Sequence, residues 1–319
     1  MKKSYLIVLS LMVFLPVSGW GLSFFKSKAQ KSSPTYVQTA QAGPSEQLRP
    51  GDYRRTAVIS GIQRYYLLHV PRGLEPGAPL VFALHGSMLN AEMMSKSYNW
   101  KKKADEEKFL VVFPNGTSRL ASGKFANWNA GNCCGYAQES DSDDVGFIRS
   151  VIDDIEGMFD TGKIYVTGIS NGAMMAYRLA CEMPEKISAI APVAGTDNTT
   201  GCTSEGPVSV MHVHSLLDPR ILYEGGCGPD CVTEIQFVSV HDTIKKWTSR
   251  NQCASETERI LENGYGYCDE YGSCANGTKV RLCTTEDGGH SWPTGSRLGQ
   301  ASQAFNATDE IWDFFESLN

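Results

Sequence analysis

The chain has 319 residues, of which 41% are hydrophobic and 20% charged, and its formal net charge is −6. This composition excludes a wholly disordered chain, a coiled coil and a collagen-like repeat, and the acidic balance argues against nucleic acid as a partner. Ten cysteines, an even number, indicate an oxidising compartment in which most of them form disulfides. The length fits one large α/β domain.

The N-terminal segment has the features of an export signal. Two lysines precede the mostly apolar run 5–17, and Val17-Ser18-Gly19 offers small residues for cleavage. The run is shorter than the roughly 20 residues that span a bilayer. We therefore expect a signal peptide at 1–22 rather than an uncleaved anchor, and a mobile leader at 23–50 that is rich in Ser, Gln, Pro and Lys. The mature protein is expected to be secreted or periplasmic and not held by a membrane.

Residues 51–319 alternate short apolar runs with helical stretches and form the predicted catalytic domain. Short apolar runs are typical of parallel strands that are buried on both faces. The alternation predicts an α/β fold with a mostly parallel central sheet flanked by helices, preceded by an antiparallel strand pair. The expected strands are 56–60, 64–70, 80–84, 109–113, 164–167, 187–193, 208–213 and 279–283, and the expected helices are 145–158, 171–182, 240–249 and 304–318.

Residues 222–284 depart from this alternation. They hold six of the ten cysteines and are loop-like outside the predicted helix 240–249, most clearly at 263–268, where two glycines fall within four positions. No long apolar run occurs in this segment. It is predicted to be a disulfide-rich insertion that lies over the rim of the sheet.

The sharpest local motif is Gly168-Ile169-Ser170-Asn171-Gly172, which follows the apolar strand 164–167 and opens a helical stretch. A G-x-S-x-G sequence between a strand and a helix is typical of a nucleophile elbow, whose tight turn exposes the serine. The flanking glycines give the backbone room for that turn. Ser170 is therefore the predicted nucleophile, and the alternative is a merely structural turn.

A serine nucleophile needs a base and an acid that orients the base, and in enzymes with such an elbow both follow the serine, the acid first. His290 lies in a glycine-rich loop after the strand 279–283 and is the predicted base. Asp218, just after the strand 208–213, is the predicted acid, with Asp197 after the preceding strand as the rival.

His212 and His214 are two positions apart on a predicted strand and share one face. They are expected to pack or hydrogen-bond there rather than to bind a metal. The acidic run Asp141–Asp144 lacks the glycine and distal glutamate of a calcium loop, and we expect it to cap the following helix. The sequence predicts no metal site and no cofactor.

The oxyanion of acyl transfer needs hydrogen-bond donors. The elbow supplies the backbone N–H of Asn171, and the loop after the strand 80–84, with His85-Gly86-Ser87, supplies the N–H of Ser87. His85 is expected to tether this loop and is not assigned to catalysis.

Further characteristic segments span roughly residues 55–317: Leu84-His85-Gly86, Trp128-Asn129-Ala130-Gly131, Cys133-Cys134-Gly135, Asp143-Asp144-Val145-Gly146-Phe147-Ile148, Val166–Met174, Ala191-Pro192-Val193-Ala194-Gly195 and Gly288-Gly289-His290-Ser291-Trp292-Pro293. With them the chain resembles the polyhydroxybutyrate depolymerase-like esterases, a group of secreted α/β-hydrolases that includes feruloyl and acetylxylan esterases. The resemblance implies Ser170, Asp218 and His290 as the triad of an α/β-hydrolase fold. The chain departs from the family's His-Gly-x-x-Asp at 214–218, where it has His-Ser-Leu-Leu-Asp.

These inferences predict a secreted serine esterase that acts on short-chain, aryl (feruloyl-type) or hydroxyalkanoate esters, either small or polymeric, through an acyl-enzyme. A serine peptidase and a non-catalytic polymer-binding protein on the same fold are the alternatives. Trp128 and Trp292 lie in segments expected to approach the triad and are predicted to bind the substrate. The aromatic residues of 222–284 either offer further flat faces to the substrate or form a small disulfide-bound core.

Overall fold

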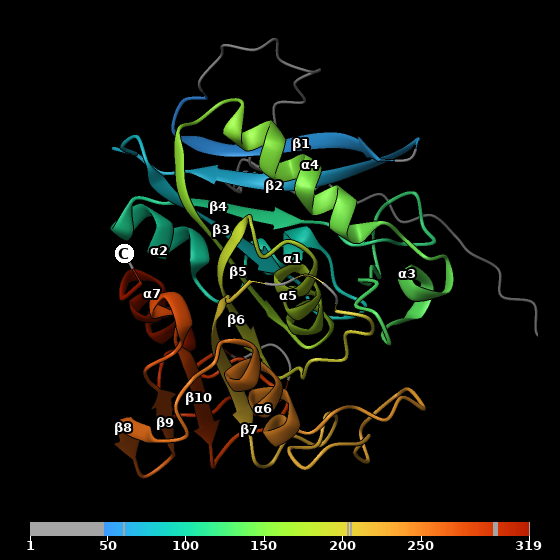
Figure 1. Cartoon of the computed structure of the whole chain (residues 1–319). Helices are drawn as coiled ribbons and strands as arrows, with labels where there is room; N and C mark the ends of the chain where they lie inside the picture. The colour runs from blue at the N-terminus through green and yellow to red at the C-terminus, as the bar shows by residue number, and fades with distance from the viewer. Residues whose placement is uncertain (1–47, 60, 203, 205, 296–298, 319) are drawn as a thin grey trace, which may run out of the picture. The chain divides into compact units, whose positions relative to one another are not determined.

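The computed structural model describes residues 48–59, 61–202, 204, 206–295 and 299–318. The predicted signal peptide 1–22, and the predicted leader up to residue 47, lie outside these residues. Ten strands of the described residues form one sheet in the order β1-β2-β4-β3-β5-β6-β7-β10-β9-β8 (Figure 1). Six neighbouring strands run parallel, namely β4, β3, β5, β6, β7 and β10. The two strands at each edge, β1 and β2 on one side and β9 and β8 on the other, pair antiparallel. The predicted α/β fold with a mostly parallel sheet is confirmed.

The elements follow the expected order closely, with α5 and β6 at the predicted boundaries. The short helices α1 to α3 and the strands β8 and β9 were not predicted. The strands are β1 Gly51–Ile59, β2 Ile62–Val70, β3 Ala78–Leu84, β4 Leu110–Pro114, β5 Thr161–Ile169, β6 Ile187–Val193, β7 Ser209–Ser215, β8 Thr257–Asn263, β9 Gly266–Tyr271 and β10 Val280–Thr285. The α-helices are α1 Ala91–Ser95, α2 Trp100–Glu107, α3 Gly135–Glu139, α4 Asp144–Glu156, α5 Asn171–Glu182, α6 Val240–Arg250 and α7 Ala307–Glu316.

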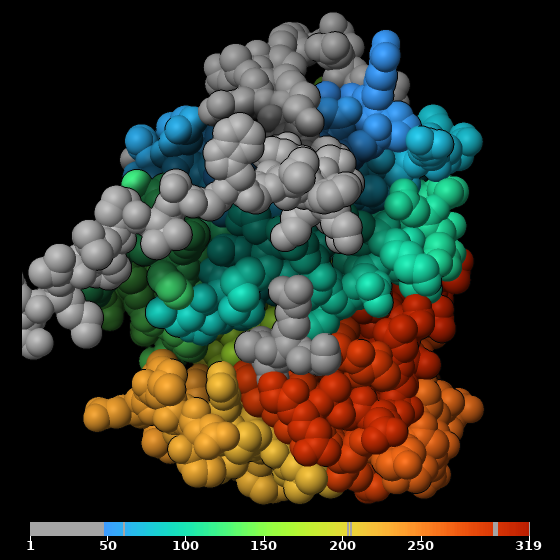
Figure 2. Space-filling view, turned by 180° about the vertical axis from the view of Figure 1, so that it is seen from behind, coloured from blue at the N-terminus to red at the C-terminus, as the bar shows by residue number. Residues whose placement is uncertain are grey.

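Helices cover both faces of the sheet. On one face α4, α5 and α6 pack against the strands, and on the other face lie α1, α2 and α7 (Figure 1). The view from behind shows the C-terminal segment in red lying beside the teal segment around α2, where Lys103 pairs with Asp309 at 2.5 Å (Figure 2). Successive β3 side chains alternate between the two cores, Phe82 in one and Val81 in the other. Burial on both faces explains why these strands are continuous apolar runs.

The parallel strands bring their carboxyl ends to one edge of the sheet. Ile169 at the end of β5 pairs with Val193 of β6, which in turn pairs with Val213 of β7. On the other side of β7, Ser215 pairs with Thr285 at the end of β10. The loops after β5, β7 and β10 therefore emerge at the same edge, where α/β sheets bind their ligands.

The segment 222–284 differs from the prediction. Instead of lying over the rim as an insertion, its second half forms the hairpin β8–β9, which pairs with β10 and extends the central sheet. Most β8 side chains are exposed, so this edge strand lacks the apolar pattern by which the inner strands were predicted. The segment is nevertheless rich in disulfides, which join Cys227 to Cys231, Cys253 to Cys274 and Cys268 to Cys283.

The remaining cysteines are also paired. Cys133 is bonded to Cys134, and Cys181 at the end of α5 is bonded to Cys202. The prediction that most cysteines form disulfides is confirmed. Within the part of the chain that the structure describes, no helix has both the length and the apolar character needed to cross a membrane.

Candidate active site

Ser170 stands at the turn between β5 and α5. Its backbone has φ 57° and ψ −122°, a strained conformation for a residue with a side chain, and its N–H donates to the Val193 carbonyl at 2.9 Å. The turn is tight because α5 begins directly against the end of β3. A Cβ at Gly172 would lie 2.5 Å from the carbonyl oxygen of His85, so only glycine fits there. The side chain of Ser170 remains partly exposed.

Asp218 and His290 are in direct contact. The Nδ1 atom of His290 lies 2.8 Å from Oδ2 of Asp218, and both residues are buried, with 4% and 2% of their surfaces exposed. The other carboxylate oxygen accepts the backbone N–H groups of Arg220 at 2.8 Å and Ile221 at 3.0 Å. Burial alone would raise the pKa of Asp218, but the hydrogen bond and charge of His290, with further help from His214 and Arg220, hold that pKa below its ordinary value.

The rival acid, Asp197, is engaged elsewhere. Its Oδ2 atom accepts the indole N–H of Trp247 at 2.9 Å and pairs with Nζ of Lys246 at 2.8 Å. Its other oxygen accepts the N–H of Thr199 at 2.9 Å. The carboxylate is thus fully used in joining the loop after β6 to α6.

Ser170 and the Asp218–His290 pair project from the same sheet edge, since β5 and β7 are separated only by β6. Because Asp218 occupies Nδ1 of His290, the Nε2 atom is left for another partner, and no residue in the described part of the chain hydrogen-bonds it. A serine hydroxyl that meets this nitrogen can give up its proton to it.

The backbone N–H groups of Ser87 and Asn171 are the candidate donors near Ser170. Gly86 lies so close to the elbow that a Cβ on it would be 3.5 Å from Cβ of Ser170, so the segment that carries Ser87 runs beside the elbow. Asn171 is the first residue of α5, where N–H groups lack acceptors within the helix. Within the described ranges, no acceptor is bound to the Ser87 N–H either. The two groups fit the requirement for an oxyanion hole.

His85 fixes the orientation of the Gly86–Ser87 peptide. Complete burial lowers the pKa of His85 to about 4, so its ring is neutral. Its Nε2 accepts the N–H of Gly116 at 2.9 Å, and Nδ1 therefore carries the proton and donates to the Gly86 carbonyl at 2.8 Å. The C=O and N–H of a trans peptide point in opposite directions. The N–H of Ser87 is thus turned away from His85.

Trp128, predicted to bind substrate, lies in the core with no exposed surface. Its indole N–H donates to the carbonyl of His85 at 2.9 Å, and its backbone N–H and C=O bind the side-chain amide of Asn171 at 2.7 and 3.0 Å. The prediction is corrected here: the indole is enclosed and has no free face for a ligand. Trp128 joins the loop after β3 to the first residue of α5.

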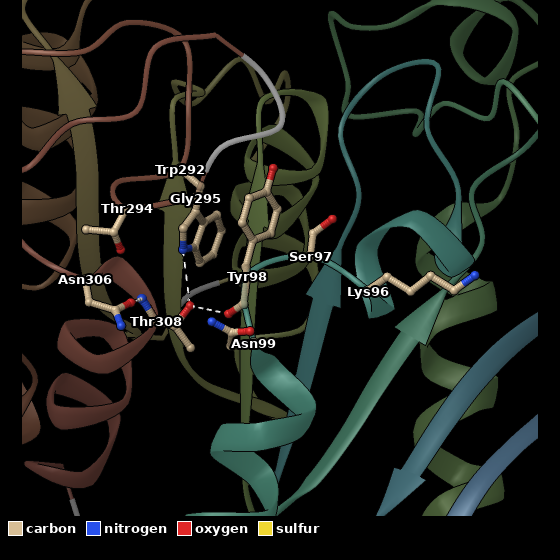
Figure 3. Close-up of a pocket in the computed structure, with 9 residues that line it drawn as sticks. All are labelled: Lys96, Ser97, Tyr98, Asn99, Trp292, Thr294, Gly295, Asn306 and Thr308. Atoms are coloured by element: carbon tan, nitrogen blue, oxygen red, sulfur yellow. Dashed lines mark hydrogen bonds between the residues drawn. The ribbon is translucent and has the colours of Figure 1, made fainter. Parts of the chain in front are cut away.

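Trp292, the other predicted substrate-binding residue, is 1% exposed. Its ring stacks on Tyr98 at 4.6 Å, and its N–H donates to Thr308 at 3.2 Å, as Figure 3 shows. It lines a small pocket of ≈ 190 Å³ to which neither Ser170 nor His290 contributes. The prediction is corrected here as well, because the ring is almost fully buried and the pocket that it lines includes no triad residue. Trp292 holds the His290 loop against the segment before α2 and the start of α7.

The aromatic residues of 222–284 divide between the two expected roles. Trp247 is fully buried, and Tyr223 and Phe237 are each 7% exposed and belong to the core between the sheet and α6. Tyr265, in the turn between β8 and β9, is 47% exposed. Most of this aromatic surface therefore stabilises the fold.

The acidic run before α4 is structural. Asp143 is the N-cap of α4 and accepts the N–H of Gly146 at 2.7 Å, as expected from the sequence. Asp144 is fully buried and pairs with Arg64 of β2 at 2.6 Å, a partner that the sequence did not indicate. Among the residues that the structure describes, no group of three His, Cys, Asp or Glu side chains is placed to hold a metal.

Sequence reasoning missed the side chains that support this site. The amide of Asn171 was overlooked because only its backbone was assigned a role. The strand positions of His212 and His214 gave their shared face, but not their contact with Tyr177 of α5. A polar residue in an otherwise apolar helix face was the available signal for Tyr177.

Comparisons with known proteins identify relatives of this arrangement. The sequence model of the family described as esterase PHB depolymerase matches residues 64–281. Feruloyl esterase B of Piromyces equi is 28% identical over 239 residues, which cover 72% of this chain and 42% of that protein. Poly(3-hydroxyalkanoate) depolymerase C of Paucimonas lemoignei is 35% identical over 266 residues, which cover 77% of this chain and 62% of that protein. The chain thus spans less than two thirds of the length of either relative.

A solved structure shares the fold. The acetyl xylan esterase from Aspergillus awamori superposes with a TM-score of 0.56 at 14% sequence identity, over 79% of this chain and 94% of the other. The similarity extends over nearly the whole of that enzyme and shows that the chain has the α/β-hydrolase fold.

Proposed function

The chain belongs to the esterase PHB depolymerase family, and from this membership we propose that it is a secreted serine esterase that hydrolyses carboxylic esters through an acyl-enzyme. The observation that carries the proposal is the buried contact of 2.8 Å between His290 and Asp218 at the sheet edge from which Ser170 projects. The paired cysteines and the predicted signal peptide support export.

The proposed reaction follows from the roles of these groups. Nε2 of His290 takes the proton of the Ser170 hydroxyl as its oxygen attacks the ester carbonyl, and Asp218 stabilises the imidazolium that forms. The N–H groups of Ser87 and Asn171 stabilise the negative charge on the carbonyl oxygen. The imidazolium returns the proton to the leaving alcohol, and an acyl-Ser170 remains. Water, deprotonated by His290, then releases the acid and restores the serine.

We propose short-chain, aryl or hydroxyalkanoate esters as substrates. The names of the relatives refer to feruloyl esters and to a poly(3-hydroxyalkanoate). The net charge of −6 disfavours strongly anionic substrates, which supports a neutral or weakly charged ester.

Ser170→Ala and His290→Ala test the catalytic assignment. Each is expected to lower kcat on p-nitrophenyl acetate or butyrate by several orders of magnitude, because triad members act as a unit. An organophosphorus ester should add one mass increment to the wild-type chain and none to Ser170→Ala. Ser150→Ala, which removes a hydroxyl bonded within α4, is the control and should behave as wild type. Labelling that persists in Ser170→Ala would refute the assignment.

A substrate panel tests the ester class. Methyl ferulate and short 3-hydroxybutyrate oligomers are expected to give higher kcat/KM than acyl esters of about ten carbons or more, which need a deep apolar pocket. Peptide substrates in the same panel should be inert. Preferential peptide hydrolysis would replace the esterase proposal with the peptidase, and a preference for long acyl chains would indicate a lipase.

A further inference from the structure

Three buried side chains connect α5 to the loop that carries Asp218. The hydroxyl of Tyr177 lies 2.8 Å from Nδ1 of His212, and Nε2 of His212 lies 3.2 Å from Nδ1 of His214. Nε2 of His214 lies 2.8 Å from the carbonyl oxygen of Ile221 and 3.4 Å from Oδ2 of Asp218. Tyr177 and both histidines are at most 1% exposed. None of the three has a role in the reaction described above.

The partners determine where the protons are. Nε2 of His214 faces only acceptors, the Ile221 carbonyl and the Asp218 carboxylate, so it carries a hydrogen. In a neutral ring Nδ1 is then an acceptor, and it receives the Nε2–H of His212. His212 in turn accepts the hydroxyl of Tyr177. All donors point along one direction, from α5 towards the loop after β7.

The surroundings keep these rings neutral. Burial lowers the pKa of His212 well below its ordinary value, and the neighbouring His214 lowers it further. Burial also lowers the pKa of His214, although Asp218 and the Ile221 carbonyl act in the opposite direction and His290 adds to the lowering. Two further ionisable side chains lie near these rings. Tyr223 packs against His214 in a T-shaped arrangement. Burial raises the pKa of Tyr177, and the charge of Asp197 raises it further.

We propose that Tyr177, His212 and His214 form a positioning chain that holds Asp218 against His290, with His214 as a neutral donor that fixes the loop at Ile221. This inference rests on the proposed function, because it assigns the chain to the acid of the same triad. The carboxylate oxygen Oδ2 lies between two imidazoles, at 2.8 Å from His290 and 3.4 Å from His214.

Neutrality of His214 matters for the charge of Asp218. A second imidazolium beside Oδ2 would share the negative charge that has to stabilise the His290 imidazolium. A neutral N–H donor holds the loop without drawing that charge away. The hydrogen on His214 Nε2 is fixed only if Nδ1 accepts, and this requires the donor of His212 and, behind it, that of Tyr177. Each member of the chain therefore has a defined task.

The kinetic test compares two replacements of His214. His214→Leu removes the donor and is expected to lower kcat about 10- to 100-fold with little change in KM, since a small displacement of a catalytic group has effects of this size. If the Asp218 carboxylate moves away from His290, the charged form of His290 is less stabilised. The acid limb of kcat/KM should therefore move to lower pH by about 0.5 to 1 unit. His214→Gln retains an N–H donor and should recover most of both effects.

Two further variants serve as a control and as a milder substitution. His241→Gln, at an exposed histidine of α6, is the control and should match wild type. Tyr177→Phe removes a single oxygen atom and is the variant to use if His214→Leu does not fold. It should lower kcat about 2- to 5-fold and shift the acid limb in the same direction by less. The proposal is overturned if folded His214→Leu or Tyr177→Phe keeps the wild-type pH profile, or if His214→Gln behaves as His214→Leu.

Imidazole ¹⁵N NMR of the full-length protein tests the positioning chain of Tyr177, His212 and His214 without relying on catalysis. His212 and His214, assigned by single His→Gln variants, are expected as neutral rings with hydrogen on Nε2 at pH 7 to 8. Hydrogen on Nδ1, or a charged ring, in either residue would overturn the proposal. If the spectra show neutral rings with hydrogen on Nε2 but Ser170 cannot be labelled or acylated, the proposed esterase function is wrong and the positioning chain is still supported.

Discussion

The two halves of the candidate site are held by different forces. Around Ser170 and Asn171, backbone groups approach so closely that position 172 requires glycine. The neutral ring of His85 fixes the orientation of the Gly86–Ser87 peptide. Around Asp218 and His290, the loops are longer and the geometry is set by buried side-chain hydrogen bonds. The first half is fixed by steric exclusion and the second by polar partners. Substitutions in the first should therefore disturb folding, and substitutions in the second should change pH dependence.

Gly172→Ala should have the largest effect. The added Cβ would lie 2.5 Å from the carbonyl oxygen of His85, a backbone atom that cannot move without displacing β3 or α5. We expect a loss of about 3 kcal/mol or more in the free energy of unfolding. The melting temperature should fall by roughly 6 to 12 °C, as measured by calorimetry.

Gly264→Ala is the matched control for this substitution. Gly264 lies in the turn between β8 and β9, and no atom is within 4 Å of the position that its Cβ would occupy. Its melting temperature should stay close to that of wild type. If Gly172→Ala were equally harmless, the tight contact between β3 and α5 would not be what fixes the elbow.

The amide of Asn171 links the two kinds of support, and Asn171→Ala should have the next largest effect. The change leaves the buried N–H of Trp128 without a partner, removes one of the two donors to its C=O, which keeps only the N–H of Cys134, and releases the start of α5, which carries a proposed oxyanion donor. We expect kcat to fall about 10- to 100-fold with KM nearly unchanged, since donors act on the transition state. Asn132→Ala, at an exposed asparagine, should leave both constants unaltered. A loss confined to KM would place Asn171 in ground-state binding instead.

The same contrast explains what the sequence could predict. The parallel strands are buried on both faces, so apolar runs marked them, and the glycine pattern around Ser170 placed β5 and α5 correctly. Steric requirements of this kind are local and leave a trace in the sequence. The hairpin β8–β9 left none, because most side chains of Thr257–Asn263 are exposed and the strand carries charges.

Contacts between distant segments were beyond the sequence. Trp128 and Trp292 occur in motifs near the site, but the motifs do not state whether an indole faces a ligand or the core. Both rings are enclosed by residues more than 15 positions away, such as His85 for Trp128 and Tyr98 for Trp292. The partner of Asp144 on β2 and that of His212 on α5 are likewise set by tertiary packing.

Acid should destabilise both halves through buried histidines. The native pKa of His85 is about 4, and burial also lowers the pKa of His212 and His214, whereas the unfolded chain protonates all three near pH 6.5. Below that pH the unfolded state binds more protons, so the free energy of unfolding falls as pH falls. His69 acts in the opposite sense: burial lowers its pKa, but hydrogen bonds to Asp52 and Asp105 outweigh this and raise it.

The smallest predicted effect isolates one of these histidines. His85→Gln removes a group that titrates on unfolding, so urea unfolding between pH 6 and pH 4.5 should show a slope reduced by about 1 kcal/mol per pH unit relative to wild type. The absolute stability of the variant does not enter, because only the change with pH is compared. His241→Gln, at a largely exposed side chain, should keep the wild-type slope. An unchanged slope in His85→Gln would mean that this ring is protonated in the native state, and then Nε2 could not accept the N–H of Gly116 and the orientation of the Ser87 peptide would need another cause.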